Sequence, residues 1–183
     1  SYKKRYPRTP QTVTQPRKRE AAAPEALAAL DDKGLNLSSA LATHMQDIDI
    51  RIDVALDEVV LSIGSENIIA VCRRAKEDPG LAFDYLRSIS VVDYIEHLEV
   101  NYHLFSLSKR HKMVIKANLP SDKPCVATVT SIWRGANWFE REAHDLFGVV
   151  FNGHPDLRPL LLYEGFEGFP GRKAFPSHEY TEW

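Results

Sequence analysis

Five ionisable side chains of types that bind metals or transfer protons lie close together toward the end of this 183-residue sequence: Glu140, Glu142, His144, Asp145 and His154. Carboxylates and imidazoles are common ligands of catalytic zinc, so a small metal-dependent hydrolase could use His144, Asp145 and His154. His144 follows Glu140 by four positions, which suits two ligands on one helix face, but no HExxH motif is present. The metal site therefore stands as an alternative hypothesis.

The same residues also have a structural interpretation, as ion pairs on the surface of one helix. Side chains four positions apart are neighbours on a helix, which predicts pairing of Glu140 with His144 and of Arg141 with Asp145. Glu142 faces another direction and could meet an arginine from elsewhere in the chain. This interpretation fits the spacing better than a metal site does.

The rest of the sequence offers no motif for a redox cofactor. Its two cysteines, Cys72 and Cys125, have no cysteine or histidine at ligand spacing, whereas an iron–sulfur cluster or a structural zinc normally takes four ligands. We expect reduced, mostly buried thiols. Neither GxGxxG nor GxxxxGK[ST] occurs, and no serine or cysteine has a nucleophile-elbow context. The chain is therefore expected to hold no flavin, dinucleotide or metal of its own.

Charge is distributed unevenly along the chain. Residues 1–19 contain seven Lys/Arg and no acid, and the remainder contains 16 basic and 25 acidic residues, a net charge of −9. With four prolines and few large aliphatic side chains, residues 1–24 are predicted to be a disordered basic arm, compatible with what remains of a mitochondrial targeting segment. The acidic remainder argues against nucleic-acid binding. No apolar run approaches the ~18–20 residues that span a bilayer, so membrane association is expected only through partners.

Residues 25–152 are predicted to form an α+β domain, in which a small, mostly antiparallel sheet is covered by helices on one face. Apolar alternation and β-branched residues predict the strands. They are expected at residues 48–54, 59–63, 88–95, 100–108 and 112–119, with a short strand at 149–151. The first two strands should form a hairpin.

Helices are predicted from capping signals and periodicity. Two short ones are expected at residues 21–30 and 38–45, the second capped by Ser38. Another should start at Ser65, with its apolar face formed by Ile68, Val71, Cys72 and Ala75. The helix that carries the ionisable cluster has Asn137 as a candidate N-cap, Glu140 at the capping-box position and Gly148 as a left-handed stop.

Residues 153–183 differ in composition from the domain before them. Pro and Gly occupy eight positions of this stretch, and six further positions are aromatic: Tyr163, Phe166, Phe169, Phe175, Tyr180 and Trp183. Pro and Gly disfavour a helix, the segment has no periodicity for a core of its own, and exposed aromatic side chains are a liability in solution. We therefore predict an extended tail that binds across a partner protein. The alternative is a tail that packs back on its own domain.

The sequence around the cluster closely resembles the signature of one protein family. The residues that match are Glu140, Arg141, Glu142, Asp145, Gly153, His154, Pro155, Arg158, Arg172 and Lys173. Upstream, Trp133, the run Asn137-Trp138-Phe139 and the segment from Phe83 to Tyr94 match as well. The family is the NuoC-type subunit of proton-pumping NADH:ubiquinone oxidoreductase, respiratory complex I. The resemblance covers about residues 80–176.

The sequence departs from the family pattern at a few positions. The family commonly has His at Phe169, Leu or Phe at Gly171, Asp at Ala174 and a second basic residue at Pro159. These differences suggest a divergent lineage. The phrase from Tyr163 to Gly168 is similar to mitochondrial and alphaproteobacterial members, which favours a mitochondrial origin.

The resemblance implies a non-catalytic core subunit in the hydrophilic arm of complex I, which transfers electrons from NADH to ubiquinone and pumps protons. Such subunits bind the large quinone-pocket subunit and neighbouring hydrophilic-arm subunits, with the C-terminal tail running along the former. Flavin and iron–sulfur clusters are then expected in partner subunits only. The implied location is the matrix side of the mitochondrial inner membrane, or the cytoplasmic face of a bacterial inner membrane. An equivalent subunit of a membrane-bound hydrogenase related to complex I remains the second alternative.

Overall fold

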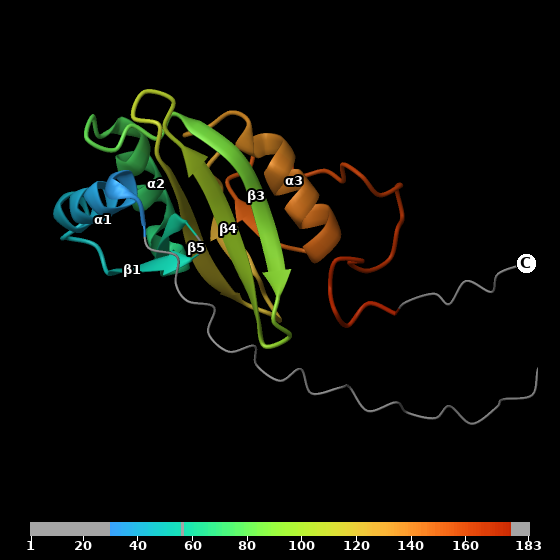
Figure 1. The fold of residues 1–183 in the computed structure, drawn as a ribbon. Coiled ribbons are helices and arrows are strands. Elements are labelled where there is room, and N and C mark those ends of the chain that lie inside the picture. Colours follow the sequence, from blue (N-terminus) through green and yellow to red (C-terminus); the bar gives the residue numbers. More distant parts are fainter. Residues whose placement is uncertain (1–29, 56, 177–183) are drawn as a thin grey trace, which may run out of the picture.

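The computed structural model of the chain describes residues 30–55 and 57–176. It consists of one five-stranded sheet, a small two-stranded sheet and three α-helices (Figure 1). Two predictions lie outside the described residues: the basic arm at residues 1–24 and the helix at residues 21–30, of which only the last residue is described. The predicted α+β class is confirmed.

The main sheet has the strand order β1-β2-β5-β4-β3. Its strands are β1 (Ile50–Ala55), β2 (Glu58–Ile63), β3 (Tyr85–Asp93), β4 (His97–Phe105) and β5 (Lys112–Pro120). The pairs β1–β2, β3–β4 and β4–β5 are antiparallel, so the predicted hairpin and the mostly antiparallel sheet are confirmed. The central pair β2–β5 is parallel and was not predicted, because it joins segments far apart in the sequence.

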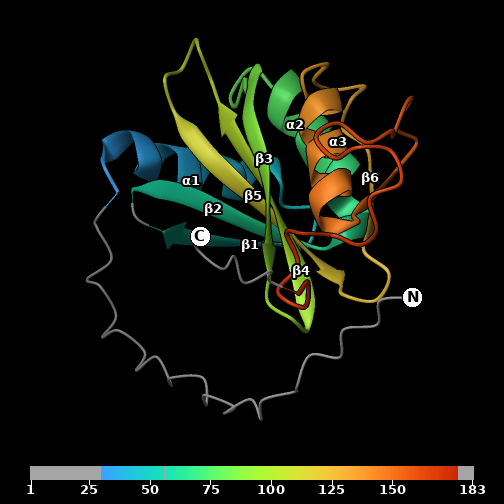
Figure 2. The ribbon, with the colours of Figure 1, turned by 90° about the vertical axis from the view of Figure 1, so that its right-hand side faces the viewer.

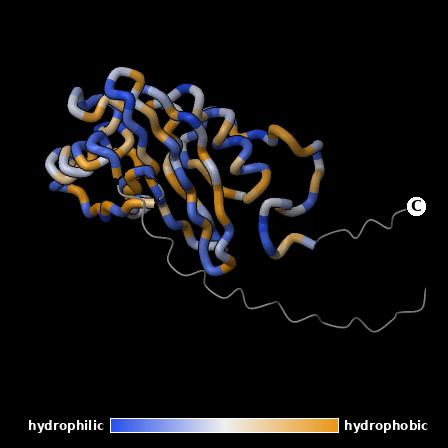
Figure 3. Tube along the Cα trace, viewed as in Figure 1, coloured by the Kyte–Doolittle hydropathy of each residue, from blue (hydrophilic) through white to orange (hydrophobic). Residues whose placement is uncertain are grey.

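The core lies between this sheet and the helices. The buried apolar side chains of β4 alternate along the strand, and Leu98, Val100, Tyr102 and Leu104 belong to the same hydrophobic cluster as buried residues of all three helices. Figure 2 shows α2 and α3 on the same side of the sheet. Figure 3 shows hydrophobic and hydrophilic residues interspersed along the strands, as expected for a sheet with one face buried.

The first described helix, α1 (Asp32–His44), starts earlier than predicted. Ser38 is inside the helix, and the N-cap is Asp31, whose carboxylate accepts a hydrogen bond from the Gly34 N–H at 2.8 Å. Gly34 is suited to the first turn because a Cβ there would lie 2.8 Å from the side chain of Leu30. The prediction of a cap at Ser38 was therefore wrong.

The second helix, α2 (Ile68–Glu77), has the predicted apolar face. Ile68, Val71, Cys72 and Ala75 are all fully buried. Ser65 does not cap this helix with its side chain, because one 3₁₀ turn, Ser65–Asn67, precedes it.

The third helix, α3 (Ala136–Phe147), is followed by the short strand β7 (Val150–Asn152), which confirms the predicted strand to within a residue. Strand β7 pairs in parallel with β6 (Cys125–Ala127), which was not predicted. From residue 153 to residue 176 the described chain contains no helix or strand. This stretch, called the C-terminal segment below, forms a loop beside α3 (Figure 1).

Candidate functional site

The candidate site is built on α3. Its small buried residues Ala136 and Ala143 allow the helix to pack closely on the sheet. Gly148 ends the helix with a φ of 73°, as predicted, and its N–H donates to the His144 carbonyl oxygen at 2.8 Å. The predicted capping box is wrong, because the helix starts after Gly135 without a side-chain cap and Glu140 points into the protein.

Glu140 is fully buried and holds the loop that precedes α3. Its carboxylate accepts hydrogen bonds from the Val129 N–H at 2.7 Å and from the Thr128 hydroxyl at 2.5 Å. Burial raises the pKa of Glu140 to about 7 and outweighs these two hydrogen bonds, which act in the opposite direction. Glu140 is therefore a structural residue whose protonation state changes near neutral pH.

His154 is the neighbour of Glu140, and its side chain is also fully buried. Its Nδ1 accepts the Asp156 N–H at 3.0 Å, so in the neutral ring the proton is on Nε2. Nε2 lies 3.3 Å from the Asn137 carbonyl oxygen and 3.9 Å from the Glu140 carboxylate. The imidazole thus fixes the start of the C-terminal segment against α3.

Asp145 holds the middle of the C-terminal segment. One of its carboxylate oxygens accepts the backbone N–H groups of three consecutive residues, Leu160, Leu161 and Leu162, at 3.1, 2.8 and 2.8 Å. Burial opposes ionisation of Asp145, but the three N–H donors together outweigh it, so its pKa is lowered. The carboxylate is charged at neutral pH, which makes these hydrogen bonds stronger than neutral ones.

Two arginines connect the C-terminal segment to the domain through backbone carbonyl groups. One, Arg141, lies on α3 and reaches carbonyl groups of the segment, and the other, Arg172, lies on the segment and reaches a carbonyl group of α3. Arg141 donates to the carbonyl oxygens of Arg158 and Pro159 at 3.0 and 2.9 Å, and its guanidinium lies 5.5 Å from the ring centroid of Trp138. Arg172 donates to the carbonyl oxygen of Phe147, the last residue of α3, at 2.6 Å, and to Ser121 at the end of β5 at 3.1 Å. The middle and the end of the C-terminal segment are thus tied to the folded domain.

A third carboxylate, Asp93 at the end of β3, completes these contacts. It is 7% exposed and accepts the Lys173 N–H at 2.8 Å and the Ile95 N–H at 2.7 Å. Burial opposes the charge of Asp93, but the hydrogen bonds from Lys173 and Ile95 lead the effects that lower its pKa. Sequence reasoning missed Asp93, because nothing in its local pattern indicates a contact with a residue so far along the chain.

The predicted ion pairs along α3 are wrong. Glu140 and Arg141 bind the loop before the helix and the C-terminal segment, respectively, and Asp145 binds the latter as well. His144 has its Nδ1 2.9 Å from the Val149 carbonyl oxygen. The three proposed hydrolase ligands therefore contact different backbone groups, and in residues 30–55 and 57–176 no three His, Cys, Asp or Glu side chains are grouped as a metal site.

Two close approaches account for the unusual residues of the C-terminal segment. A Cβ on Gly171 would lie 2.7 Å from the Phe147 ring and 2.9 Å from the Leu146 carbonyl oxygen, which accepts the Gly171 N–H. A Cβ on Gly148 would lie 2.6 Å from the ring of Phe169. The departures Phe169 and Gly171 therefore belong to one packed contact at the end of α3.

The remaining signature residues lie on the outside. Glu142, Gly153, Pro155 and Arg158 are exposed. Arg158 forms an ion pair with Asp156 at 2.7 Å, and both side chains are well exposed, so this pair adds little stability. Gly153 has a φ of 83°, which allows the turn after β7.

Large apolar side chains are exposed next to these contacts. Trp138, Leu161 and Tyr163 are 61%, 59% and 72% exposed. Trp138 and Glu142 are one turn apart on α3, and the Leu161 N–H is one of the three donors to Asp145. We refer to the exposed residues Trp138, Glu142, Leu161 and Tyr163 together as the docking face. Figure 3 shows hydrophobic stretches on the loop beyond α3 that contributes to it.

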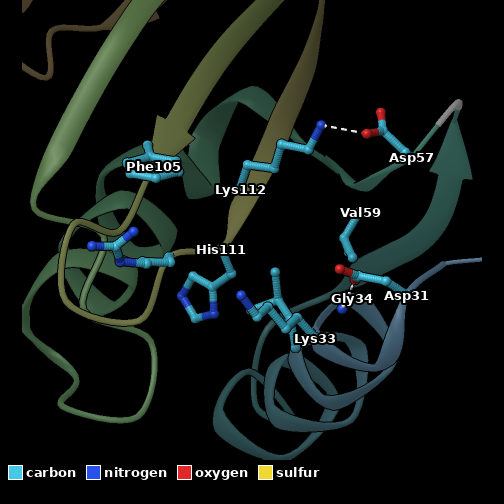
Figure 4. A pocket seen from close by; sticks show the side chains of 10 residues that line it. Asp31, Lys33, Gly34, Asp57, Val59, Phe105, His111 and Lys112 are labelled. Atoms are coloured by element: carbon cyan, nitrogen blue, oxygen red, sulfur yellow. Dashed lines mark hydrogen bonds and ion pairs between the residues drawn. The ribbon is translucent and has the colours of Figure 1, made fainter.

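The buried cysteine and a surface hollow contribute none of the contacts described above. Cys72 is buried in α2, and burial raises the pKa of its thiol far above the usual range. A hollow of about 340 Å³ lies between the start of α1 and the turn after β4 (Figure 4). Lys112 on its wall is paired with Asp57 at 2.7 Å. None of the residues predicted from the sequence as site residues lines it.

Comparison with known protein families gives one extended match. The family described as "Respiratory-chain NADH dehydrogenase, 30 Kd subunit" matches residues 61–181, which is more than half of the chain. Among curated relatives, the NADH-quinone oxidoreductase C-subunit 2 of Rhizobium meliloti (strain 1021) is 47% identical over 124 residues, which cover 66% of this chain and 68% of the relative. The family match, residues 61–181, includes all the contacts of α3 described above.

Solved structures agree on the fold. The chain is similar to a trypsin-resistant fragment of Nqo5, with a TM-score of 0.57 and 30% identity, covering 67% of this chain and 99% of the fragment. It also shares its fold with a chain of the membrane-bound sulfane sulfur reductase, an archaeal respiratory membrane complex. There the TM-score is 0.65 at 24% identity, covering 75% of this chain and 84% of the other.

Proposed function

The chain belongs to the family of the 30 Kd subunit of respiratory-chain NADH dehydrogenase, and from this membership we propose how it acts within the complex. It is the NuoC-type subunit of NADH-quinone oxidoreductase, complex I, in the hydrophilic arm. We propose that its docking face binds the large quinone-pocket subunit. Neighbouring hydrophilic-arm subunits are then its other partners.

One observation carries the proposal: α3 holds the C-terminal segment in a fixed path through backbone hydrogen bonds. Asp145 and Arg141 bind its middle. At its end, Arg172 donates to the last residue of α3 and the Lys173 N–H donates to Asp93. A segment ordered before binding loses little conformational entropy when it meets a partner. The signature residues thus support docking by shaping the surface, and Glu140 and His154 do so from inside the protein.

The exposed residues of the docking face have the chemistry of an interface centre. Tryptophan, tyrosine and arginine contribute most of the binding energy in many interfaces, and Trp138 already lies against Arg141. Glu142 is exposed, and no described side chain forms an ion pair with it. It is therefore available to a cationic side chain of the partner.

In this proposal the chain holds no cofactor, and flavin and iron–sulfur clusters reside in partner subunits. Within the described residues, no helix is both long and apolar enough to cross a bilayer. We place the chain at the membrane through its partners, on the matrix side of the mitochondrial inner membrane or the cytoplasmic face of a bacterial one. The curated relative described above is bacterial, so the mitochondrial origin rests on the sequence features alone.

The second candidate, an equivalent subunit of a related membrane-bound complex, shares the same fold. The likeness to the archaeal sulfane sulfur reductase chain is one of fold and does not decide between the two. The identity to a subunit of a bacterial NADH-quinone oxidoreductase favours complex I. The nickel content of the neighbouring large subunit decides between them. A quinone-pocket subunit without nickel would support complex I, and a nickel-bearing subunit would support the hydrogenase.

Removal of two exposed side chains tests the docking face. We expect Trp138→Ala to lower the amount of assembled complex about tenfold, and Glu142→Ala to lower it less, since both remove exposed side chains that the proposal assigns to the partner contact. The thermal midpoint of the isolated chain should hardly change, because surface substitutions cost little stability. Native gels of a strain that lacks the wild-type gene measure the first quantity, and thermal unfolding the second.

Two matched variants on the other helices serve as controls for this experiment. Leu35 on α1 is 56% exposed and Glu77 on α2 is exposed. Leu35→Ala and Glu77→Ala should assemble normally. Normal assembly of Trp138→Ala together with loss of turnover would contradict the docking role and point to direct participation in catalysis.

A further inference from the structure

The turn between β3 and β4 contains a strained residue. Ile95 has a φ of 74°, and its side chain is 69% exposed. The turn is closed by the Tyr94 N–H, which donates to the His97 carbonyl oxygen at 2.9 Å. At the first central position of such a hairpin turn glycine is preferred, and a β-branched residue at positive φ is an outlier. The fold alone would be served better by glycine.

Side-chain contacts on both sides hold the turn in this conformation. The buried Asp93 carboxylate accepts the Ile95 N–H at 2.7 Å, and the ring of Tyr94 stacks on His97 with centroids 4.9 Å apart. A strained residue persists only where its surroundings determine its conformation, and such residues gather at functional sites. The turn therefore presents Ile95 in one defined direction.

The side chains that the turn presents are apolar. Tyr94 is 47% exposed and Val92 39%, next to Ile95. A partner could bury these side chains with little loss of conformational entropy, because the turn is already ordered. Ile95 is a strained residue whose side chain is 69% exposed, and this combination points to a role at an interface.

This turn is continuous with the end of the C-terminal segment. Asp93 binds Ile95 with one carboxylate oxygen and the Lys173 N–H with the other, and the Lys173 ammonium lies 5.9 Å from the centroid of the Tyr94 ring. Figures 1 and 2 both show the β3–β4 turn beside the last part of the segment. The two surfaces are fixed relative to each other by one buried carboxylate.

We propose that Ile95, flanked by Tyr94 and Val92, is a second anchor that inserts into an apolar depression on the subunit that binds the docking face. The proposal rests on the proposed function, since it assumes the same partner. We assign the same occupant from continuity: the C-terminal segment carries Leu161 and Tyr163 of the docking face, and Asp93 joins the end of this segment to the turn.

Three substitutions of Ile95 test the anchor. Ile95→Gly relieves the strain and removes the side chain, so we expect the thermal midpoint of the isolated full-length chain to rise by about 2–4 °C. The same variant should lower the assembled complex about tenfold. Ile95→Ala should lower assembly equally while having the lower midpoint of the two, and Ile95→Leu should retain assembly. Opposite effects on stability and assembly are not expected of a residue with a merely structural role.

A matched control is Leu107, which is 63% exposed in the turn after β4, at the other end of that strand. Leu107→Ala should assemble normally. Normal assembly of Ile95→Gly would overturn the anchor. A lowered thermal midpoint of the isolated Ile95→Gly chain would also overturn it, because the side chain would then be used by this chain itself or by a second copy of it. If Trp138→Ala fails to assemble while Ile95→Gly assembles normally, only the anchor fails. If both assemble normally, the proposed docking itself fails.

Discussion

Replacing Asp145 by alanine is expected to detach the middle of the C-terminal segment from α3 and to reduce the assembled complex to less than about a tenth of the wild-type amount. The substitution removes the only side-chain acceptor that the described structure provides for the N–H groups of Leu160, Leu161 and Leu162. Hydrogen bonds to a charged group contribute about 1.5–3 kcal/mol each, but water can reach part of this segment, so we expect the isolated chain to lose about 2 kcal/mol of stability. Hydrogen exchange of these three amides and native gels measure the two effects.

Asparagine at the same position provides a graded comparison. Asp145→Asn keeps an acceptor oxygen but no charge, so its amide protection and assembly should lie between those of the wild type and Asp145→Ala. Asp156→Asn, at a carboxylate whose partner Arg158 is exposed, serves as the control and should assemble normally. Unchanged protection of the three amides in Asp145→Ala would contradict the role assigned to this carboxylate.

The charge of Asp145 also sets the pH range in which this contact operates. The pKa of Asp145 is lowered from its ordinary value of 3.8. A carboxylate with a depressed folded-state pKa stabilises the protein above its unfolded-state pKa, and this contribution is lost as pH falls through the folded-state value. The segment is therefore fully held at neutral pH.

Glu140→Gln is expected to abolish the part of the pH dependence of stability that comes from ionisation of the Glu140 carboxyl group. Burial raises the pKa of Glu140 from 4.5 to about 7. The stability that the uncharged Glu140 side chain contributes is fully present below its unfolded-state pKa. It is lost as pH rises through the folded-state pKa, because the buried carboxyl group must then ionise. Over this range the wild type should lose about 3 kcal/mol relative to Glu140→Gln, at about 1.4 kcal/mol per pH unit.

Urea unfolding of both proteins at a series of pH values from 4 to about 8 measures this difference. Burial lowers the pKa values of His103 and His111, so they also contribute to the pH dependence of stability, but they are present in both proteins and cancel in the comparison. Glu140→Ala is a harsher variant, since it leaves the Val129 N–H and the Thr128 hydroxyl without their acceptor. A constant difference between the wild type and Glu140→Gln across the whole range would contradict the raised pKa.

Local rules predicted those parts of the fold that depend on neighbouring residues. The apolar face of α2, the hairpin of β1 and β2 and the left-handed end of α3 at Gly148 all follow from periodicity or from a single residue type. The parallel pairing of β2 with β5 and of β6 with β7 could not be predicted in this way, because both pairs join segments separated by other elements.

The candidate site shows the same limit in side-chain chemistry. Spacing along α3 predicted that Arg141 pairs with Asp145, as on an isolated helix, but other segments cover α3 and their backbone groups bind these side chains instead. Resemblance to the family selected candidate residues without indicating what they bind. Thr128 and Asp93 carry no local signal at all, since their partners are reached only in the folded protein.

Chemical cross-linking of the intact complex, purified through a tag on this chain, tests the central claim most directly. With a lysine- and acid-reactive reagent and identification by mass spectrometry, we predict cross-links from Glu142 and Lys173 to the quinone-pocket subunit, in a preparation with NADH:quinone activity. Cross-links of these two residues only to other subunits, or a chain that purifies alone, would contradict the account of α3 and its C-terminal segment as the docking site.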